Sequence, residues 1–228
     1  TGVPDKHHVE PGEFPHVATQ KDALTKGDPS DPGWMQPEDQ IAGAGLALSL
    51  KLGPTRTLTT SFGEGAWWDT SGRTRLARAD ASAAPVALTQ LGPRGEHAGP
   101  PPESSGDRRQ AGFTAALQAA GVEVDRAERA VGWIDVSDGT RAVAVGMRHF
   151  LEEYPKELRV DGTSGLLEAL TWSPSAGPAS FERMNARPGA EGSVENWAQG
   201  LAKTSEFVFF FHAAKPAEEV SRTVGFVL

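Results

Sequence analysis

The chain has 228 residues, a formal net charge of −8 and no cysteine. The negative charge argues against nucleic acid as a partner, because no basic surface is available to neutralise phosphates, and it gives no reason to expect an anionic membrane. The missing cysteines exclude disulfides, thiolate metal sites and cysteine nucleophiles. Glycine, with 26 residues, and proline, with 17, are frequent, which favours many short strands over long helices.

The first part of the chain lacks a clear hydrophobic period. Residues 1–40 are rich in Pro, Asp, Gly and Lys, which indicates an irregular segment, and residues 41–228 are expected to form a single β-sandwich domain. Since the chain starts without Met, contains no leader-like apolar stretch and ends on apolar residues, we expect this domain to be cut from a larger multidomain enzyme.

Alternating apolar and polar residues predict strands along most of the chain. At residues 46–52 every second residue is Leu, so we expect the leucine face to meet the core and the other face to meet water. The same reasoning predicts further strands at residues 55–61, 67–70, 73–78, 85–91, 113–118, 122–129 and 166–172. This spacing is typical of an all-β fold, an antiparallel β-sandwich of many short strands with few short helices.

The strongest local signal is a hairpin. Residues 131–136 and 140–147 are apolar runs joined by Ser-Asp-Gly, and Asp-Gly between such runs predicts a tight hairpin connection. We assign both Asp135 and Asp138 to this turn. A calcium loop would need a regular series of oxygen ligands, which the sequence lacks.

The last third of the chain predicts one more strand and two helices. Residues 206–212, EFVFFFH, are apolar enough for a strand that is buried on both faces. Short helices are expected at residues 193–202 and 216–222.

Two separated blocks of sequence carry a family resemblance. Residues 132–158 read GWIDVSDGTRAVAVGMRHFLEEYPKEL, and residues 201–212 read LAKTSEFVFFFH. In this order they resemble the central β-sandwich domain of the exo-rhamnogalacturonan lyase and YetA-like family. The chain departs from the family pattern at Leu151, where Trp is frequent, and at Ser205, where His is frequent. The resemblance implies a sandwich between an amino-terminal small barrel and a carboxy-terminal α/α toroid, so flanking domains of the same polypeptide are expected partners.

The resemblance also implies a function. It points to a polysaccharide lyase that acts by β-elimination on rhamnose- and uronate-containing chains of the rhamnogalacturonan type, with an acidic polysaccharide or oligosaccharide as partner. It implies neither a cofactor nor a metal, and an extracytoplasmic, secreted bacterial location. The isolated domain is expected to be inactive. The alternative is a non-catalytic module that binds carbohydrate or packs between neighbouring domains.

Such an elimination needs a cation at the uronate carboxylate, together with a base and an acid. Arg148 is the best candidate for the cation, because its planar fork can donate two parallel hydrogen bonds to a carboxylate. A strand-end Arg paired with Glu152 or Glu153 is equally compatible with the sequence. His149 and His212 are further candidates for substrate binding, although a histidine at a strand end often has a structural hydrogen bond.

Lys156, Lys203 and Tyr154 are the candidates for proton transfer. Partial burial would lower the pKa of Lys156 and allow it to act as a base, while a Lys whose stem covers apolar surface is the plain alternative. Tyr154 is the only tyrosine of the chain, and its phenol could carry a proton or simply pack. Lys203 is preferred to His212, because the two would lie at opposite ends of one strand.

Overall fold

The computed structural model describes residues 40–66, 71–92, 112–180, 204–225 and 228. The chain divides into two compact units, Thr1–Ile41 with Ala179–Ala202, and Ala42–Pro178 with Lys203–Leu228. In the first unit, the described residues form an antiparallel pair of β1 (Gln40–Ile41) and β12 (Ala179–Ser180). All other described elements belong to the second unit.

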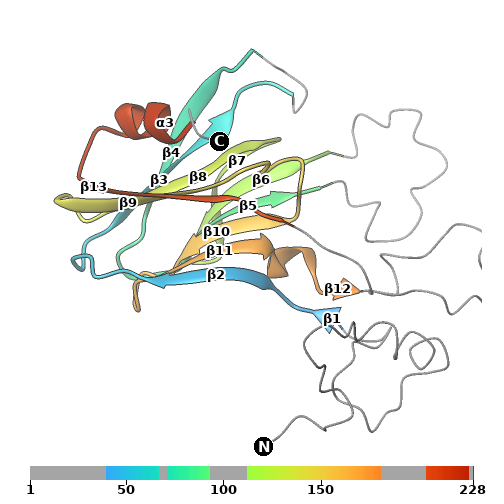
Figure 1. Ribbon diagram of the computed structural model, residues 1–228, viewed down its shortest axis with the longest axis horizontal. Coiled ribbons are helices and arrows are strands. Elements are labelled where there is room, and N and C mark those ends of the chain that lie inside the picture. The colour runs from blue at the N-terminus through green and yellow to red at the C-terminus, as the bar shows by residue number, and fades with distance from the viewer. Residues whose placement is uncertain (1–39, 67–70, 93–111, 181–203, 226–227) are drawn as a thin grey trace, which may run out of the picture. The chain divides into compact units, whose positions relative to one another are not determined.

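Two antiparallel sheets make up the second unit (Figure 1). The six-stranded sheet has the order β2 (Ala44–Ser49), β11 (Leu166–Trp172), β10 (Lys156–Val160), β5 (Val86–Leu91), β6 (Thr114–Ala119) and β7 (Val122–Ala127). The five-stranded sheet has the order β13 (Phe207–Ala213), β9 (Arg141–Met147), β8 (Ala130–Ser137), β3 (Thr57–Gly63) and β4 (Thr74–Asp80). The described helices are a 3-10 turn, η3 (Pro174–Ala176), and α3 (Ala217–Gly225). The predicted all-β sandwich is confirmed.

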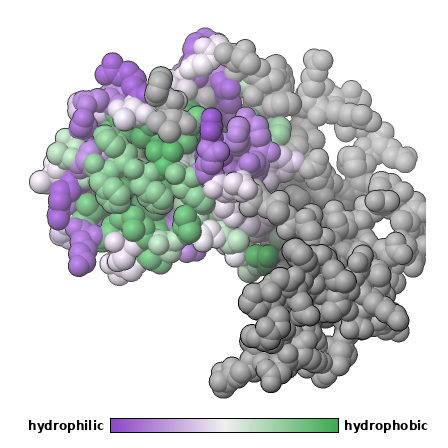
Figure 2. Space-filling model, viewed as in Figure 1, coloured by the Kyte–Doolittle hydropathy of each residue, from purple (hydrophilic) through white to green (hydrophobic). Residues whose placement is uncertain are grey.

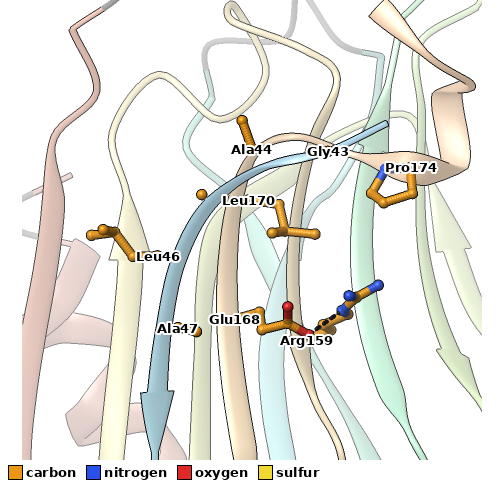
Figure 3. Close-up of a pocket in the computed structure, with 9 residues that line it drawn as sticks. Gly43, Ala44, Leu46, Ala47, Arg159, Glu168, Leu170 and Pro174 are labelled. Atoms are coloured by element: carbon orange, nitrogen blue, oxygen red, sulfur yellow. Dashed lines mark hydrogen bonds and ion pairs between the residues drawn. The ribbon is translucent and has the colours of Figure 1, made fainter. Parts of the chain in front are cut away.

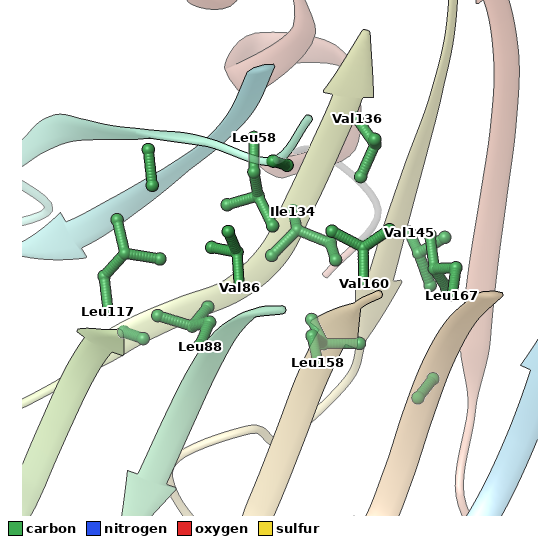
Figure 4. Close-up of a cluster of buried hydrophobic side chains, with 14 of the residues drawn as sticks. Leu58, Val86, Leu88, Leu117, Ile134, Val136, Val145, Leu158, Val160 and Leu167 are labelled. Atoms are coloured by element: carbon green, nitrogen blue, oxygen red, sulfur yellow. The ribbon is translucent and has the colours of Figure 1, made fainter. Parts of the chain in front are cut away.

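The main core lies between the two sheets (Figure 4). Each sheet contributes aliphatic side chains from alternate strand positions, as the pleat of a β-strand requires. Fully burying one such side chain contributes about 1.5–3 kcal/mol, so this layer is the main source of stability. The five-stranded sheet supplies Leu58, Ile134, Val136 and Val145, and the six-stranded sheet supplies Val86, Leu88, Leu117, Leu158, Val160 and Leu167.

A second, smaller core lies on the outer face of the five-stranded sheet. The apolar side of α3 packs there through Val220 and Val224, against Trp133 of β8. The Trp133 indole is fully buried, and its Nε1 donates a hydrogen bond to Ser61 Oγ at 3.0 Å. Strand β8 is therefore covered on both faces. Neither described helix is long and apolar enough to cross a membrane.

The predicted strands lie close to their expected positions in the described residues, with two exceptions in burial. The strand expected at residues 46–52 is β2, but Leu46 is 48% exposed, so the predicted burial of its leucine face is wrong at that end. Among the described strands, β2 is the outermost one of its sheet, and it pairs on one side with β11. Leu50 and Leu52, which follow β2, do pack against the main core.

Strand β13 corrects the second expectation. It was expected to be buried on both faces, yet Phe209 is 40% and Phe211 66% exposed. Apolar residues gather on the surface over β13 (Figure 2). The reason is again position, because β13 is the edge strand of its sheet. Only Phe207 packs against the main core, and Phe210, on the other face, packs against the cluster under α3.

The hairpin of β8 and β9 is confirmed, but only one of its two aspartates lies in the turn. Asp138 accepts backbone N–H groups from Arg141 at 2.7 Å, Gly53 at 2.8 Å and Thr140 at 2.9 Å. These three donors hold the pKa of Asp138 far below its usual range. Assigning Asp135 to the turn was wrong, because Asp135 lies within β8 and is 4% exposed.

Strand β10 was missed by sequence reasoning. Its residues, KELRV, place Leu158 and Val160 in the main core and the charged Glu157 and Arg159 on the other face. The charged residues of this segment obscure the alternation of apolar and polar residues that would predict a strand. The strand expected at residues 67–70, the helix expected at residues 193–202 and Lys203 lie outside the described residues, whereas the helix at residues 216–222 is confirmed as α3.

Gly132 is required by the backbone of β8. It has φ +95°, and an added Cβ would lie 2.4 Å from Cβ of Phe150 and 2.9 Å from the Met147 carbonyl oxygen. We expect Gly132→Ala to lower the free energy of unfolding by about 2–3 kcal/mol, since strain and a clash add. Gly121→Ala is the matched control, because Gly121 has φ +76° and open space. Equal losses in urea unfolding would contradict the expected clash.

Candidate functional site

Four of the six predicted site residues lie on one stretch of chain. This stretch, residues 148–156, connects β9 to the beginning of β10 and is called here the β9–β10 connection. Phe150 anchors it, because the Phe150 ring is 2% exposed in the main core. The Glu153 backbone N–H donates to the His149 carbonyl at 2.9 Å, which closes one turn. Arg148, His149, Tyr154 and Lys156 are thereby held near one end of the sandwich.

Lys156 is the most buried of these residues. Its side chain is 0% exposed, and its Nζ lies 2.6 Å from the Arg148 carbonyl oxygen and 2.8 Å from Oε2 of Glu153. Leu158 and Val160, at alternate positions of β10, point into the main core, so Lys156 points to the same side. The ammonium group therefore ties the two ends of the β9–β10 connection together.

Arg148 is far more accessible to solvent than Lys156, the other positively charged residue of the β9–β10 connection. Its Nη1 donates to Glu206 Oε2 at 2.8 Å, and both side chains are open to solvent, 45% and 61% exposed. Its backbone N–H also donates to the Glu206 carbonyl at 3.1 Å. Within the described residues, no second partner of this guanidinium group is found, so two of its three nitrogens can face a ligand. The alternative in which Arg148 pairs with Glu152 or Glu153 is not what the structure shows, because its partner is Glu206.

His149 and Tyr154 flank these cations differently. His149 is exposed and has φ +52°. Tyr154 is half-buried, and its ring meets Phe113 edge-on at 5.3 Å between centroids. The ring also lies against Gly92, where an added Cβ would fall 1.8 Å from Cε2 of Tyr154. The Tyr154 ring is thus held by packing, while the His149 imidazole is open to solvent.

His212 does not join this group. It pairs with Ala142 near the other end of β9, whereas Phe207 pairs with Met147 next to Arg148. Five residues of strand separate these two positions, which is about 17 Å. The His212 side chain is 2% exposed, with Nε2 3.1 Å from Asp135 Oδ1 and a stacked contact to Phe210 at 4.7 Å. Lys203 lies outside the described residues.

The chemistry of the connection follows from this geometry. Arg148 and His149 present polar groups to solvent, whereas Lys156 and Tyr154 are held inside. Arg148 and Glu206 balance each other's charge, as do Lys156 and Glu153. In the described part of the chain, no group of three or more His, Asp or Glu side chains could hold a metal ion. The accessible atoms suit recognition of an anionic group.

A second polar group was missed entirely. Arg159 of β10 and Glu168 of β11 are directly opposite each other, and Arg159 Nε donates to Glu168 Oε2 at 2.6 Å. A register between two strands is needed to see this pair. In the sequence, Arg159 and Glu168 are simply two opposite charges in separate segments. The segment of Arg159, β10, was not predicted to be a strand, so the pairing could not be foreseen.

About half of the chain matches a known family of protein domains. Residues 114–224 match the family model described as the PcRGLX-like protein central beta sandwich domain. The match runs from the first residue of β6 into α3, and so contains the β8–β9 hairpin, the β9–β10 connection and β13. No curated protein matches the chain. The resemblance noted from the two sequence blocks is confirmed, since residues 114–224 match the model of the PcRGLX-like central β-sandwich domain.

Proposed function

We propose that the chain is the sandwich domain of a polysaccharide lyase-like enzyme that acts by β-elimination on rhamnose- and uronate-containing polysaccharides. Within that enzyme, its task is to bind the uronate carboxylate. The observation that carries this proposal is the solvent-open guanidinium of Arg148, which lies in the region that matches the family. The exposed His149 beside it adds a second polar group.

The chemistry of β-elimination explains why such a cation matters. A base removes the C5 proton of the uronate, its electron pair forms the C4–C5 double bond, and the C4–O bond breaks. The leaving oxygen then takes a proton. Negative charge develops on the uronate carboxylate as C5 loses its proton, so an arginine that binds this group lowers the barrier. Arg148 can supply two parallel hydrogen bonds for this purpose.

The geometry favours binding over proton transfer within this chain. A base must come within hydrogen-bond distance of the proton it removes, but Lys156 is 0% exposed and its Nζ is surrounded by the Arg148 carbonyl and Glu153. Tyr154 is packed against Phe113. We therefore propose that neither Lys156 nor Tyr154 is the base, while Lys203 lies outside the described residues and stays a candidate.

The proposal predicts a specific loss in Arg148→Ala. We expect the affinity of the chain for acidic rhamnogalacturonan oligosaccharides to fall about tenfold or more, because a charge-assisted pair of hydrogen bonds is lost. Isothermal titration calorimetry with these oligosaccharides measures the effect. In the full polypeptide, the same change should slow the release of unsaturated uronate, followed by its near-ultraviolet absorbance.

Arg126→Ala is the matched control for this change. Arg126 is an exposed arginine paired with Glu123 on β7, at the edge of the other sheet, and its loss should leave the affinity unchanged. Equal affinities of the Arg148 variant and the unchanged chain would refute the assigned role of Arg148. Binding without any unsaturated product from the full polypeptide would instead favour a non-catalytic binding module.

A further inference from the structure

A small pocket opens on the outer face of the six-stranded sheet. It has a volume of about 250 Å³ and is lined by residues 43–47 at β2 and by Arg159, Glu168, Leu170 and Pro174. In Figure 3 the Arg159–Glu168 pair lies below Leu170 and Pro174. The side chains of β2 here are mostly Gly and Ala, which leaves the pocket open.

The Arg159–Glu168 pair forms the polar wall of the pocket, and the neighbouring Glu157 helps to hold Arg159 in place. Arg159 Nη1 lies 3.4 Å from Glu157 Oε1, and the other oxygen of Glu157 accepts hydroxyls from Ser173 at 2.5 Å and Ser175 at 3.1 Å. Glu157 is 3% exposed. Arg159 is therefore held between two carboxylates, one buried and one at the pocket. In the described structure, Nη2 of Arg159 and Oε1 of Glu168 have no partner.

The charge of this wall selects a class of ligand. Two glutamates surround one arginine, so the group carries an excess negative charge and disfavours a carboxylate such as that of a uronate. A free N–H donor beside a free carboxylate oxygen matches two neighbouring hydroxyl groups, one accepting and one donating. Leu170 and Pro174 supply apolar surface for the C–H groups of a ring.

The size of the pocket suits a single sugar ring. Pockets for drug-sized ligands span about 300–1,000 Å³, and this pocket is smaller. We propose that it is a subsite for a single neutral hexopyranose residue, whose neighbouring hydroxyls bridge Arg159 and Glu168. The carbohydrate class rests on the proposed function, and the neutral character rests on the charges of the pocket. Residues 43–47 lie outside the matched region, whereas Arg159, Glu168, Leu170 and Pro174 lie within it.

The test uses the complete chain labelled with nitrogen-15 and two probes, methyl α-L-rhamnopyranoside as the neutral sugar and galacturonate as the acidic one. We expect the neutral sugar to give saturable shifts at the amides of Gly43, Gly45 and Ala47. Galacturonate should affect them less. Glu168→Gln should weaken the neutral sugar about tenfold, the loss of one charged hydrogen bond.

Two further variants sharpen the test. Glu123→Gln alters the matched glutamate of the Arg126 pair on β7 and should leave the sugar response unchanged. Ala47→Phe fills the pocket from an exposed position of the edge strand, so the fold should persist and binding should disappear. An unchanged response in both Glu168→Gln and Ala47→Phe, or no neutral-sugar shifts at residues 43–47, overturns the proposal.

The outcome is separable from that of the proposed function. Arg148→Ala should leave the neutral-sugar shifts intact, because Arg148 does not line the pocket. Loss of acidic binding in Arg148→Ala without any neutral-sugar shifts overturns the subsite alone. If the neutral-sugar shifts appear and Arg148→Ala binds the acidic oligosaccharides as well as the unchanged chain does, the subsite is supported and the assigned role of Arg148 is overturned.

Discussion

His212→Ala is expected to lower the free energy of unfolding by about 3–5 kcal/mol at neutral pH, because it leaves a buried charge without its partner. The side chains of His212 and Asp135 are 2% and 6% exposed, and Nε2 lies 3.1 Å from Asp135 Oδ1. The other ring nitrogen, Nδ1, lies 2.8 Å from the Ala213 carbonyl oxygen. Each ring nitrogen of His212 therefore lies within hydrogen-bond distance of an oxygen. Urea unfolding measures the loss.

The loss of stability in His212→Ala should depend on pH. Burial raises the pKa of Asp135, and the nearby His212 acts in the opposite direction. A raised carboxyl pKa in the fold means that stability is fully present below the unfolded pKa and declines as pH rises through the folded pKa. Without His212 the folded pKa of Asp135 rises further. The cost of His212→Ala should therefore shrink as the pH is lowered and Asp135 takes up a proton.

Two variants test this account of the pair. His149→Asn removes an exposed imidazole and should change the free energy of unfolding by less than about 0.5 kcal/mol. Asp135→Asn combined with His212→Ala should be less costly than His212→Ala alone, because no buried charge is left. A loss in His212→Ala that is equally large at mildly acidic and neutral pH would argue against an ionised Asp135 as its cause.

Lys156→Ala is the second large effect, with an expected loss of about 2–4 kcal/mol in the free energy of unfolding. The change removes a buried stem and leaves Glu153 and the Arg148 carbonyl without their shared donor. The expected range lies below that of a fully buried pair because Glu153 is 30% exposed. Urea unfolding gives the loss, and faster amide exchange at Glu153 would report the loosened β9–β10 connection.

Lys215→Ala is the control for this experiment. Lys215 forms an ion pair with Glu219 at 2.5 Å, with both side chains open to solvent, so its loss should hardly change the free energy of unfolding. A fully stable Lys156→Ala chain would contradict the structural role of the ammonium group. If the lyase proposed above also lost its activity in this variant, Lys156 would return to the candidates for the base.

The strands and the β8–β9 hairpin were predictable because their signals are local. Alternation of apolar residues and an Asp-Gly turn act within a few residues of chain, and both appear at β8 and β9 as expected. Which strand becomes an edge depends on the order of the whole sheet. The exposure of Leu46 and Phe211 therefore followed from topology and not from their own sequence.

In the candidate site, too, the features with local signals were predictable and those that depend on sheet topology were not. Arg148 and Lys156 are close in sequence, so their shared connection could be foreseen, but the burial of Lys156 depends on the direction of an unpredicted strand. The pair of Asp135 and His212 is 77 residues apart and spans β9. The pair of Arg159 and Glu168 needs the register of β10 with β11. No local pattern carries such information.

The burial of β8 on both faces has a consequence for how the chain can vary. Residues 132–136 are all buried, between the main core on one side and α3 on the other. An ordinary surface strand such as β7, where most side chains are exposed, can accept polar substitutions at alternate positions. Strand β8 has no such alternate positions along this run. Viable sequence changes should therefore accumulate at the sheet margins and leave β8 as one unbroken, slowly varying block.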